Sequence, residues 1–236
     1  METEPRCLGR YPLGPSLGCA VEGSAGQVSK SQHLLAPTKV VAGAGRLAEN
    51  LACFFVGTGR KRPIGLGRGF HGRNVHSSKK RGPKVGKTKR GKGSKLMVVA
   101  DGKGIPMGVS LHSASPHEIT LAEETLENVS VPRKGPGRSR KNPDRLIADK
   151  AYDSEPFRRR LARRGIELIA PHKSNRRKAA TQDGRSLRRY RKRWKIARTI
   201  AWIGNYRRLV VRWDRRDDIY LSFVYIACAL TTCNHL

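Results

Sequence analysis

Acidic residues are scarce in this chain of 236 residues, and the first Asp is Asp101. The sequence holds 18 Asp and Glu against 49 Lys and Arg, a formal net charge of +31 with a pI near 11.0. Self-repulsion on this scale costs stability unless a polyanion screens it. The imbalance therefore indicates nucleic acid as the partner.

Long hydrophobic runs are also missing. The longest apolar run is IYLSFVYIACAL (219–230), which has 12 residues, whereas a membrane-spanning helix needs roughly 20. No charged start with an apolar core and a cleavage site is present, so we expect neither a membrane protein nor a secretion signal. The five cysteines form no CxxC pair and have no His at zinc-ligand spacing, which predicts reduced thiols in the cytoplasm.

Regular patterning is lacking in residues 1–69. This segment contains four Glu and no Asp, and its Gly, Ala, Leu and Pro follow neither a helical nor a strand period. Little apolar surface can be buried there, so we expect poor order up to residue 69 and a folded domain over residues 70–236. The stretch 47–57 is the candidate for a short helix, and a fortuitous apolar run explains it equally well.

The segment from Arg60 to Lys95 is strongly basic, with 14 Lys or Arg and no acid. Its last part, GKTKRGKGSK (86–95), spaces cations with glycines that let the backbone approach a phosphate strand. A nucleotide-binding P-loop is excluded, because Gly93 rather than Ser or Thr follows Lys92. The residues predicted here to contact nucleic acid are Lys87, Lys89, Arg90, Lys92 and Lys95.

Folded α/β structure is predicted from about residue 95 onward. Two strands, 95–101 and 105–112, are joined by the turn DGKG and predict a hairpin. A helix over 116–129 and a loop over 132–144 follow, with six Lys or Arg in residues 133–145. The order strand, helix, strand is then predicted by RLIAD, by SEPFRRRLARRG between Ser154 and Gly165, and by IELIAP. This βαβ unit predicts parallel strands.

Asp149 ends the strand RLIAD, and functional groups gather at the carboxyl ends of parallel strands. A solvated loop acid that pairs with nearby cations is the alternative interpretation.

The stretch RRYRKRWKIARTIAW (188–202) predicts a helix with two stripes. Ile196, Ile200 and Ile203 form the stripe that faces the core. The adjoining stripe is predicted to border the functional site, and it contains Tyr190, Arg193, Trp194, Ala197 and Ala201. Half-buried aromatic residues beside a solvated cationic face remain an alternative interpretation.

From about Lys79 to Leu236, these segments together resemble the DDE transposases of bacterial insertion sequences. The resemblance is to the group with the signature Tyr, two residues, Arg, three residues, Glu, and it is carried by GKTKRGKGSK, LIADKAYDS, GIELIAPHKSNR and RRYRKRWKIARTIAW. It implies an RNase H-like mixed sheet flanked by helices, Mg²⁺ as cofactor and cleavage and transfer of DNA strands. The implied partners are transposon-end and target DNA and further copies of the chain, in the bacterial cytoplasm and on the nucleoid when DNA is bound.

The family mechanism uses three carboxylates that hold two divalent ions. The resemblance places the middle carboxylate, a catalytic and metal-binding residue, on Asp149. The third falls on Ala197, and the first falls on Gly72 or an immediate neighbour, so two ligands are lost. Asp101 lies in a predicted turn and is not expected to replace them. We therefore expect no catalysis.

The missing first carboxylate and the unpatterned residues 1–69 together suggest a shifted reading frame up to about Arg73, and a sheet that lacks its first strand. Three interpretations then remain. The chain is a degenerate transposase that binds DNA, or a basic nucleic-acid-binding protein whose likeness is coincidental, or a reading frame that yields no stable protein. In the first, the predicted helix adds the DNA contacts Arg188, Arg189, Tyr190, Arg191, Arg193 and Trp194.

Overall fold

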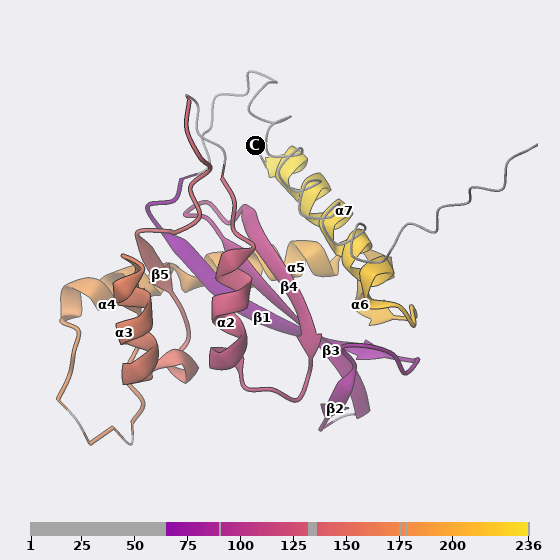
Figure 1. Cartoon of the computed structure of the whole chain (residues 1–236), viewed down its shortest axis with the longest axis horizontal. Coiled ribbons are helices and arrows are strands. Elements are labelled where there is room, and N and C mark those ends of the chain that lie inside the picture. The colour runs from indigo at the N-terminus through magenta and orange to yellow at the C-terminus, as the bar shows by residue number, and fades with distance from the viewer. Residues whose placement is uncertain (1–64, 90, 132–135, 175, 178, 236) are drawn as a thin grey trace, which may run out of the picture. The chain divides into compact units, whose positions relative to one another are not determined.

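The computed structural model describes residues 65–235 except 90, 132–135, 175 and 178. The candidate helix at 47–57 and nearly all of the segment 1–69 lie outside the described residues. The strands are β1 (Gly69–Ser78), β2 (Gly86–Thr88), β3 (Gly91–Ala100), β4 (Pro106–Ser113), β5 (Arg145–Ile147), β6 (Glu167–Ile169) and β7 (Val211–Arg212). The helices are α2 (Glu118–Glu127), α3 (Glu155–Arg163), α4 (Gly184–Tyr190), α5 (Trp194–Gly204), α6 (Arg207–Val210) and α7 (Asp217–His235), with 3₁₀ turns at Lys150–Tyr152 and Arg191–Arg193 (Figure 1).

The strands form one mixed sheet with β1 at its centre. On one side β1 pairs antiparallel with β3, which in turn pairs antiparallel with β4 and β2. On the other side β1 pairs parallel with β5, and β5 with β6. This antiparallel hairpin beside a parallel crossover unit is the RNase H-like arrangement, and the expected α/β class is confirmed.

The predicted connections explain why these strands pair as they do. Asp101 and Gly104 begin and end the turn between β3 and β4, and Gly104 has φ +94°, a backbone conformation that suits glycine. Ser154 precedes α3 and Gly165, at φ +74°, follows it. The predicted hairpin and the predicted parallel βαβ unit are therefore both confirmed.

The expectation of a missing first strand is wrong. Residues Gly69–Ser78 form β1, and Phe70 lies opposite Ala100 on one side and Ile147 on the other. The stretch GFHGRNVHSS has few residues of high strand propensity, but two neighbouring strands supply main-chain partners that any residue except Pro can use. The sheet is thus complete at its centre.

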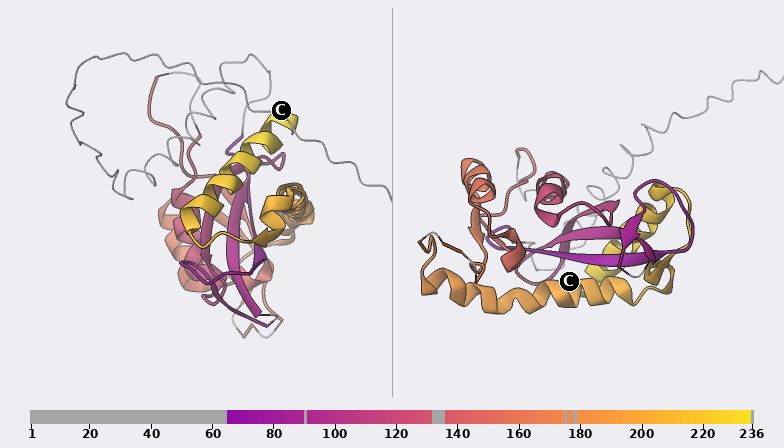
Figure 2. Two further views of the ribbon diagram at one scale, coloured as in Figure 1. Left: turned by 90° about the vertical axis from the view of Figure 1, so that its right-hand side faces the viewer. Right: turned by 90° about the horizontal axis from the view of Figure 1, so that it is seen from below.

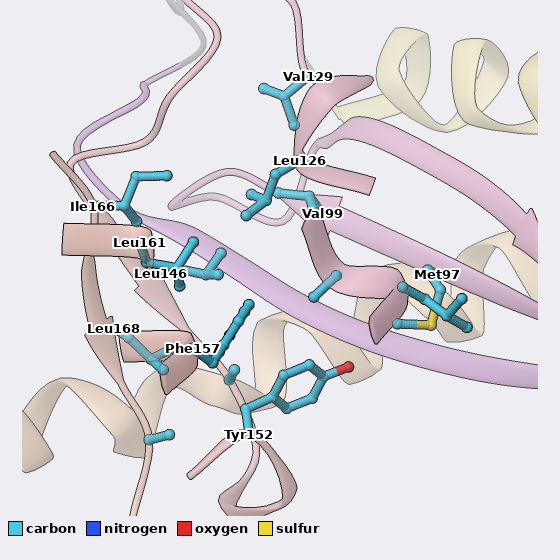
Figure 3. Close-up of a cluster of buried hydrophobic side chains, with 14 of the residues drawn as sticks. Met97, Val99, Leu126, Val129, Leu146, Tyr152, Phe157, Leu161, Ile166 and Leu168 are labelled. Atoms are coloured by element: carbon cyan, nitrogen blue, oxygen red, sulfur yellow. The ribbon is translucent and has the colours of Figure 1, made fainter. Parts of the chain in front are cut away.

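Each face of the sheet has its own hydrophobic core. On the face of α2 and α3, Met97, Val99 and Leu146 pack against residues such as Phe157 and Leu161 (Figure 3). Figure 2 shows α4 and α5 on the opposite face, and side chains of α7 pack into the same core as those of α5. There, the buried side chains include Phe70, Leu96, Val98, Ile147, Ile196, Ile203 and Tyr220.

The predicted helix at 188–202 consists of three joined segments. α4 leads into the 3₁₀ turn Arg191–Arg193, and α5 follows without a gap, which gives the long orange rod of Figure 2. Ile196 and Ile203 are buried and Ile200 is partly buried, so the predicted core stripe is confirmed. Tyr190 and Arg193 of these segments reach Asp149, which follows the carboxyl end of β5.

Candidate catalytic centre and nucleic-acid surface

Asp149 lies just beyond β5, on the face of the sheet that α5 covers. Its Oδ1 accepts a hydrogen bond from the backbone N–H of Lys150 at 2.8 Å and a longer one from the Tyr190 hydroxyl at 3.4 Å. Nη2 of Arg193 forms an ion pair with Oδ2 at 3.4 Å, and Nη1 of Arg193 donates to the Tyr190 hydroxyl at 3.2 Å. The carboxylate, which is 40% exposed, thus already has a protein cation as its partner.

Gly72 lies on β1, two residues beyond Phe70, and Phe70 is opposite Ile147 of β5. Asp149 follows the end of β5 at the same distance along the chain from Ile147. A Cβ atom at position 72 would lie 2.6 Å from Cγ1 of Ile196 and 3.0 Å from Cδ1 of Ile200. The volume that a carboxylate at position 72 needs is therefore filled by two aliphatic side chains of α5.

The neighbouring His71 points to the opposite face of the sheet. Its ring meets the Tyr152 ring edge to face, with 5.0 Å between the ring centres. Neither ring nitrogen has a hydrogen-bond partner among the described residues, and burial lowers the pKa of His71 to about 4. A side chain at position 72 would thus point toward α5, whereas His71 points to the face that Tyr152 occupies.

Ala197 is exposed and lies one helical turn beyond Arg193 on α5. Of the three positions that the resemblance assigns to metal ligands, Gly72 and Ala197 carry no donor atom. Within the described part of the chain, no group of three or more His, Cys, Asp or Glu side chains could hold a metal ion. The residues present do not fit a two-metal site.

Asp101 does not supply a substitute ligand. It is buried in the turn between β3 and β4, where its Oδ1 accepts hydrogen bonds from the backbone N–H groups of Lys103 at 2.7 Å and Ile105 at 2.8 Å. This is the turn role predicted for an Asp-Gly pair.

Asp153 has a structural role that the sequence analysis did not identify. Its side chain is 2% exposed and contacts Arg158 at 3.1 Å, Arg176 at 3.2 Å and His172 at 3.0 Å. Burial alone would raise the pKa of this carboxyl, but hydrogen bonds from the Lys173 backbone N–H, His172 and Arg158 outweigh it and lower the pKa to about 2. Asp153 thereby holds part of the chain between β6 and α4 against α3.

The predicted DNA contacts in residues 86–95 differ in how far they are buried. Lys87, Lys89 and Lys92 are exposed, and Arg90 lies outside the described residues. Lys95 is 4% exposed and its Nζ donates to the carbonyl oxygen of Pro116, so its assignment as a DNA contact is withdrawn. From Gly93 to Ala100, β3 is buried on both of its faces, and the chain that precedes α2 covers the side on which Lys95 lies.

Some cations of the predicted loop at 133–145 are paired within the protein. Arg140 contacts Asp144 at 3.2 Å, and Arg145 contacts Glu167 at 2.8 Å. Arg138 and Lys141 are exposed.

The basic residues of α4 and the following turn lie largely at the surface. Arg188 and Arg191 are exposed, Arg189 is half-buried, and Trp194 is 54% exposed. Arg198 was missed as a candidate. The signal that could have identified it is its position between Trp194 and Trp202 at intervals of four residues, since such residues are neighbours on a helix.

None of the helices in the described part of the chain has the length and apolar composition that a membrane span requires.

Comparisons with known proteins identify the family of the chain. A Burkholderia cepacia protein named "Putative transposase for insertion sequence element IS402" is 35% identical over 144 residues, which are 61% of this chain and 64% of that protein. The chain therefore spans just under two thirds of the length of this relative.

Among solved structures, the piggyBac transposase synaptic complex with hairpin DNA has a chain that is 11% identical, with coverage of 84% of this chain and 52% of that one and a TM-score of 0.48. The Mos1 strand transfer complex has one that is 11% identical, with coverage of 89% and 66% and a TM-score of 0.28. The family model described as "Transposase DDE domain" matches residues 60–232. The chain belongs to the family of proteins with a transposase DDE domain.

Proposed function

We propose that this chain binds DNA as a transposase does but cannot cleave it. The observation that carries the proposal is the state of Asp149. It is one carboxylate where the family mechanism needs three, and Arg193 and Tyr190 already bind it. Gly72 and Ala197, the positions for the other two, offer a hydrogen and a methyl group in place of oxygen ligands.

Loss of the ligands removes the chemistry that bound divalent ions supply in this family. Those ions activate the attacking oxygen and stabilise the leaving oxygen of the phosphodiester, a contribution of several kcal/mol. Each ~1.4 kcal/mol of lost transition-state stabilisation slows the reaction about tenfold. A lone aspartate paired with arginine therefore gives no measurable cleavage.

DNA binding is supported by a different set of residues, which these losses leave intact. Exposed cations between the start of β2 and the first residues of β3, in the loop before β5, and in α4 with the 3₁₀ turn that follows it can each meet a phosphate and release a counterion. The set is Lys87, Lys89, Lys92, Arg138, Lys141, Arg188 and Arg191. Transposon ends are the proposed specific ligand, target DNA the second, and self-association on DNA follows from the same family membership.

The first test measures DNA binding and cleavage by the unaltered protein. Its affinity for a labelled duplex, followed by fluorescence anisotropy, should fall steeply as salt rises from about 50 to 200 mM, because several phosphates are neutralised. A duplex with the inverted-repeat ends of the source element should bind more tightly than a random duplex, and no nick should appear with Mg²⁺ or Mn²⁺. Cleavage by the unaltered chain would overturn the proposal.

Two observations argue against the alternative interpretations. The family match overturns the view that the likeness to transposases is coincidental. The view that no stable protein forms assumed a missing first strand, which β1 contradicts. A cooperative unfolding transition of the purified chain would show directly that a stable protein forms.

A further inference from the structure

Helix α7 has no charged face. From Ile219 to Asn234 it carries no Asp, Glu, Lys or Arg, although such residues make up 28% of the chain. It is the yellow helix of Figure 1, and its side chains Tyr220, Val224 and Ala227 are buried in the core that α5 also contacts. A helix that is apolar on all sides is usually buried on all sides. In the described part of the chain, however, one side of α7 lies at the surface.

The exposed side of α7 forms a narrow apolar stripe. Ile219 is 40% exposed, Ile226 is 54% exposed and Leu230 is 46% exposed. With the partly buried Phe223, these residues follow at intervals of four, three and four. At 100° per residue they lie within an arc of about 60°, which is the stripe that a coiled coil uses. We call this stripe of Ile219, Phe223, Ile226 and Leu230 the α7 seam.

Net charge limits what can cover the α7 seam. At a formal charge of +31, a second copy is repelled from most of the surface, but the seam itself contributes no charge to this repulsion. At the start of α7, Asp217 is paired with Lys84 at 3.5 Å. Asp218 is likewise paired with Arg216. The seam therefore favours an occupant whose own contact surface is apolar and uncharged.

The seam of a second copy meets this requirement, and it fits best when the two helices are antiparallel. About a two-fold axis, Ile219 of one copy faces Leu230 of the other. Phe223 then faces Ile226, so every seam residue has an apolar partner. The start of each helix, with the exposed Arg215, lies beside the carboxyl end of the other, which is the negative end of the helix dipole. A parallel pair would instead bring the like charges at the two starts together.

We propose that the α7 seam is a contact surface between two copies of this chain, formed by antiparallel α7 helices. The seam covers about three helical turns, which is at the small end of protein interfaces. The dimer is therefore weak, with a dissociation constant in the micromolar range. DNA that holds two copies would raise their effective concentration and strengthen it. The inference rests on the proposed self-association and names its surface, but it needs no DNA.

The first test measures the mass of the full chain without DNA by analytical ultracentrifugation. Between about 2 and 200 µM, the 26.2 kDa monomer should convert to a species of twice that mass. The dimer should strengthen as NaCl rises from about 50 to 500 mM, because salt screens the repulsion between copies and leaves the apolar contact in place. DNA binding should show the opposite dependence on salt.

Substitutions then locate the contact. Ile226→Lys should abolish the dimer, because it places a cation on the seam of each copy. Ile226→Gln should weaken it about tenfold or more, since apolar contact is lost in both copies. Val75→Lys is the matched control, because Val75 is an exposed apolar residue of β1, and it should leave the dimer unchanged. Circular dichroism checks that each variant is folded.

A charge exchange tests the antiparallel arrangement. Ile219→Lys and Leu230→Glu should each weaken the dimer alone and restore it when the two variants are mixed, because only antiparallel helices bring the two substituted positions together. Mixing without recovery would overturn this arrangement.

The remaining outcomes separate this inference from the proposed function. A dimer that survives Ile226→Lys would place the contact elsewhere. A chain that stays monomeric overturns the inference, and a lower unfolding midpoint in Ile226→Lys would then show that the seam is covered within one chain, whereas an unchanged midpoint would leave it to a different protein. Loss of DNA binding by a chain that still dimerises would overturn the proposed DNA binding alone.

Discussion

At the scale of single residues, the carboxylate of Asp153 contributes more to stability than any surface ion pair should. It is almost fully buried, and the cationic side chains of Arg158 and Arg176 that bind it are themselves largely buried. Removal of one member of such a network leaves the others without compensation in a medium of low polarity. Asp149 is partly exposed, as is its partner Arg193, so their ion pair should contribute less to stability.

Asp153→Asn is predicted to lower the free energy of unfolding by about 3 kcal/mol, because the buried guanidinium of Arg158 loses its counter-charge and Arg176 keeps only its ion pair with Glu155. Urea unfolding at pH 7 measures this loss. Asp144→Asn is the control, since Asp144 and Arg140 form an exposed pair that contributes less than about 1 kcal/mol. Equal losses in the two variants would contradict the role given to Asp153.

The same carboxylate predicts a dependence of stability on pH. Its pKa is lowered from 3.8 to about 2 in the folded chain, so its stabilising contribution is fully present above pH 3.8 and is lost as the pH falls toward 2. A shift of this size corresponds to about 2 kcal/mol. In urea unfolding between pH 2 and pH 6, Asp153→Asn should lack this part of the decline, and an unchanged pH profile in the variant would contradict the assignment.

At the scale of elements, the contact between β1 and α5 decides whether the catalytic centre can be rebuilt. Ile196 and Ile200 occupy the space in front of Gly72, and Cγ1 of Ile196 is the atom that a Cβ at position 72 would meet first. Restoration of acidic residues alone therefore places the new Asp against aliphatic carbon.

We predict that Ala197→Glu, and Ala197→Glu combined with Gly72→Asp, remain inactive in a supercoiled-plasmid nicking assay with Mg²⁺. Addition of Ile196→Ala to the double variant should restore nicking, because it removes the closest obstructing atom at 2.6 Å and leaves only Cδ1 of Ile200, the end of a flexible side chain, at 3.0 Å. The control is the same triple variant with Asp149→Asn, which should stay inactive. Activity of the double variant would show that the steric obstruction is unimportant, and activity of Ala197→Glu alone would show that position 72 is not the site of the first ligand.

The elements also differ in how well the sequence predicts them. The hairpin and the βαβ unit were predictable because turn residues such as Asp101, Gly104 and Gly165 mark their ends. β1 was not predictable from propensity, since its pairing with β3 and β5 is imposed by tertiary structure. The burial of Lys95 was missed for a related reason, because it depends on the chain segments that cover both faces of β3 and not on the cation-rich sequence itself.

At the scale of the whole molecule, net charge opposes the compact state. With a formal charge of +31, the chain is predicted to unfold at a higher temperature as NaCl rises from 10 to 150 mM, because the screening length falls from about 30 to about 8 Å. Circular dichroism at both salt concentrations measures this midpoint. A midpoint that stays constant or falls would show that self-repulsion does not limit stability.

The arrangement of the candidate site was only partly predictable at this scale. The sequence predicts which positions carry or lack a carboxylate, since Asp149, Gly72 and Ala197 can be aligned with the family pattern. It does not predict that Arg193 pairs with Asp149, or that α5 closes the space beside Gly72, because both depend on how the helix crosses the sheet.

The short 3₁₀ turn at Arg191–Arg193 gives the spacing between Tyr190 and Arg193 a geometric meaning. Residues three apart are eclipsed in a 3₁₀ turn, whereas in an α-helix they diverge by about 60°. The phenol and the guanidinium consequently project in the same direction and reach one carboxylate. Insertion or deletion of a single residue between them would rotate one away from Asp149 even though both side chains were retained.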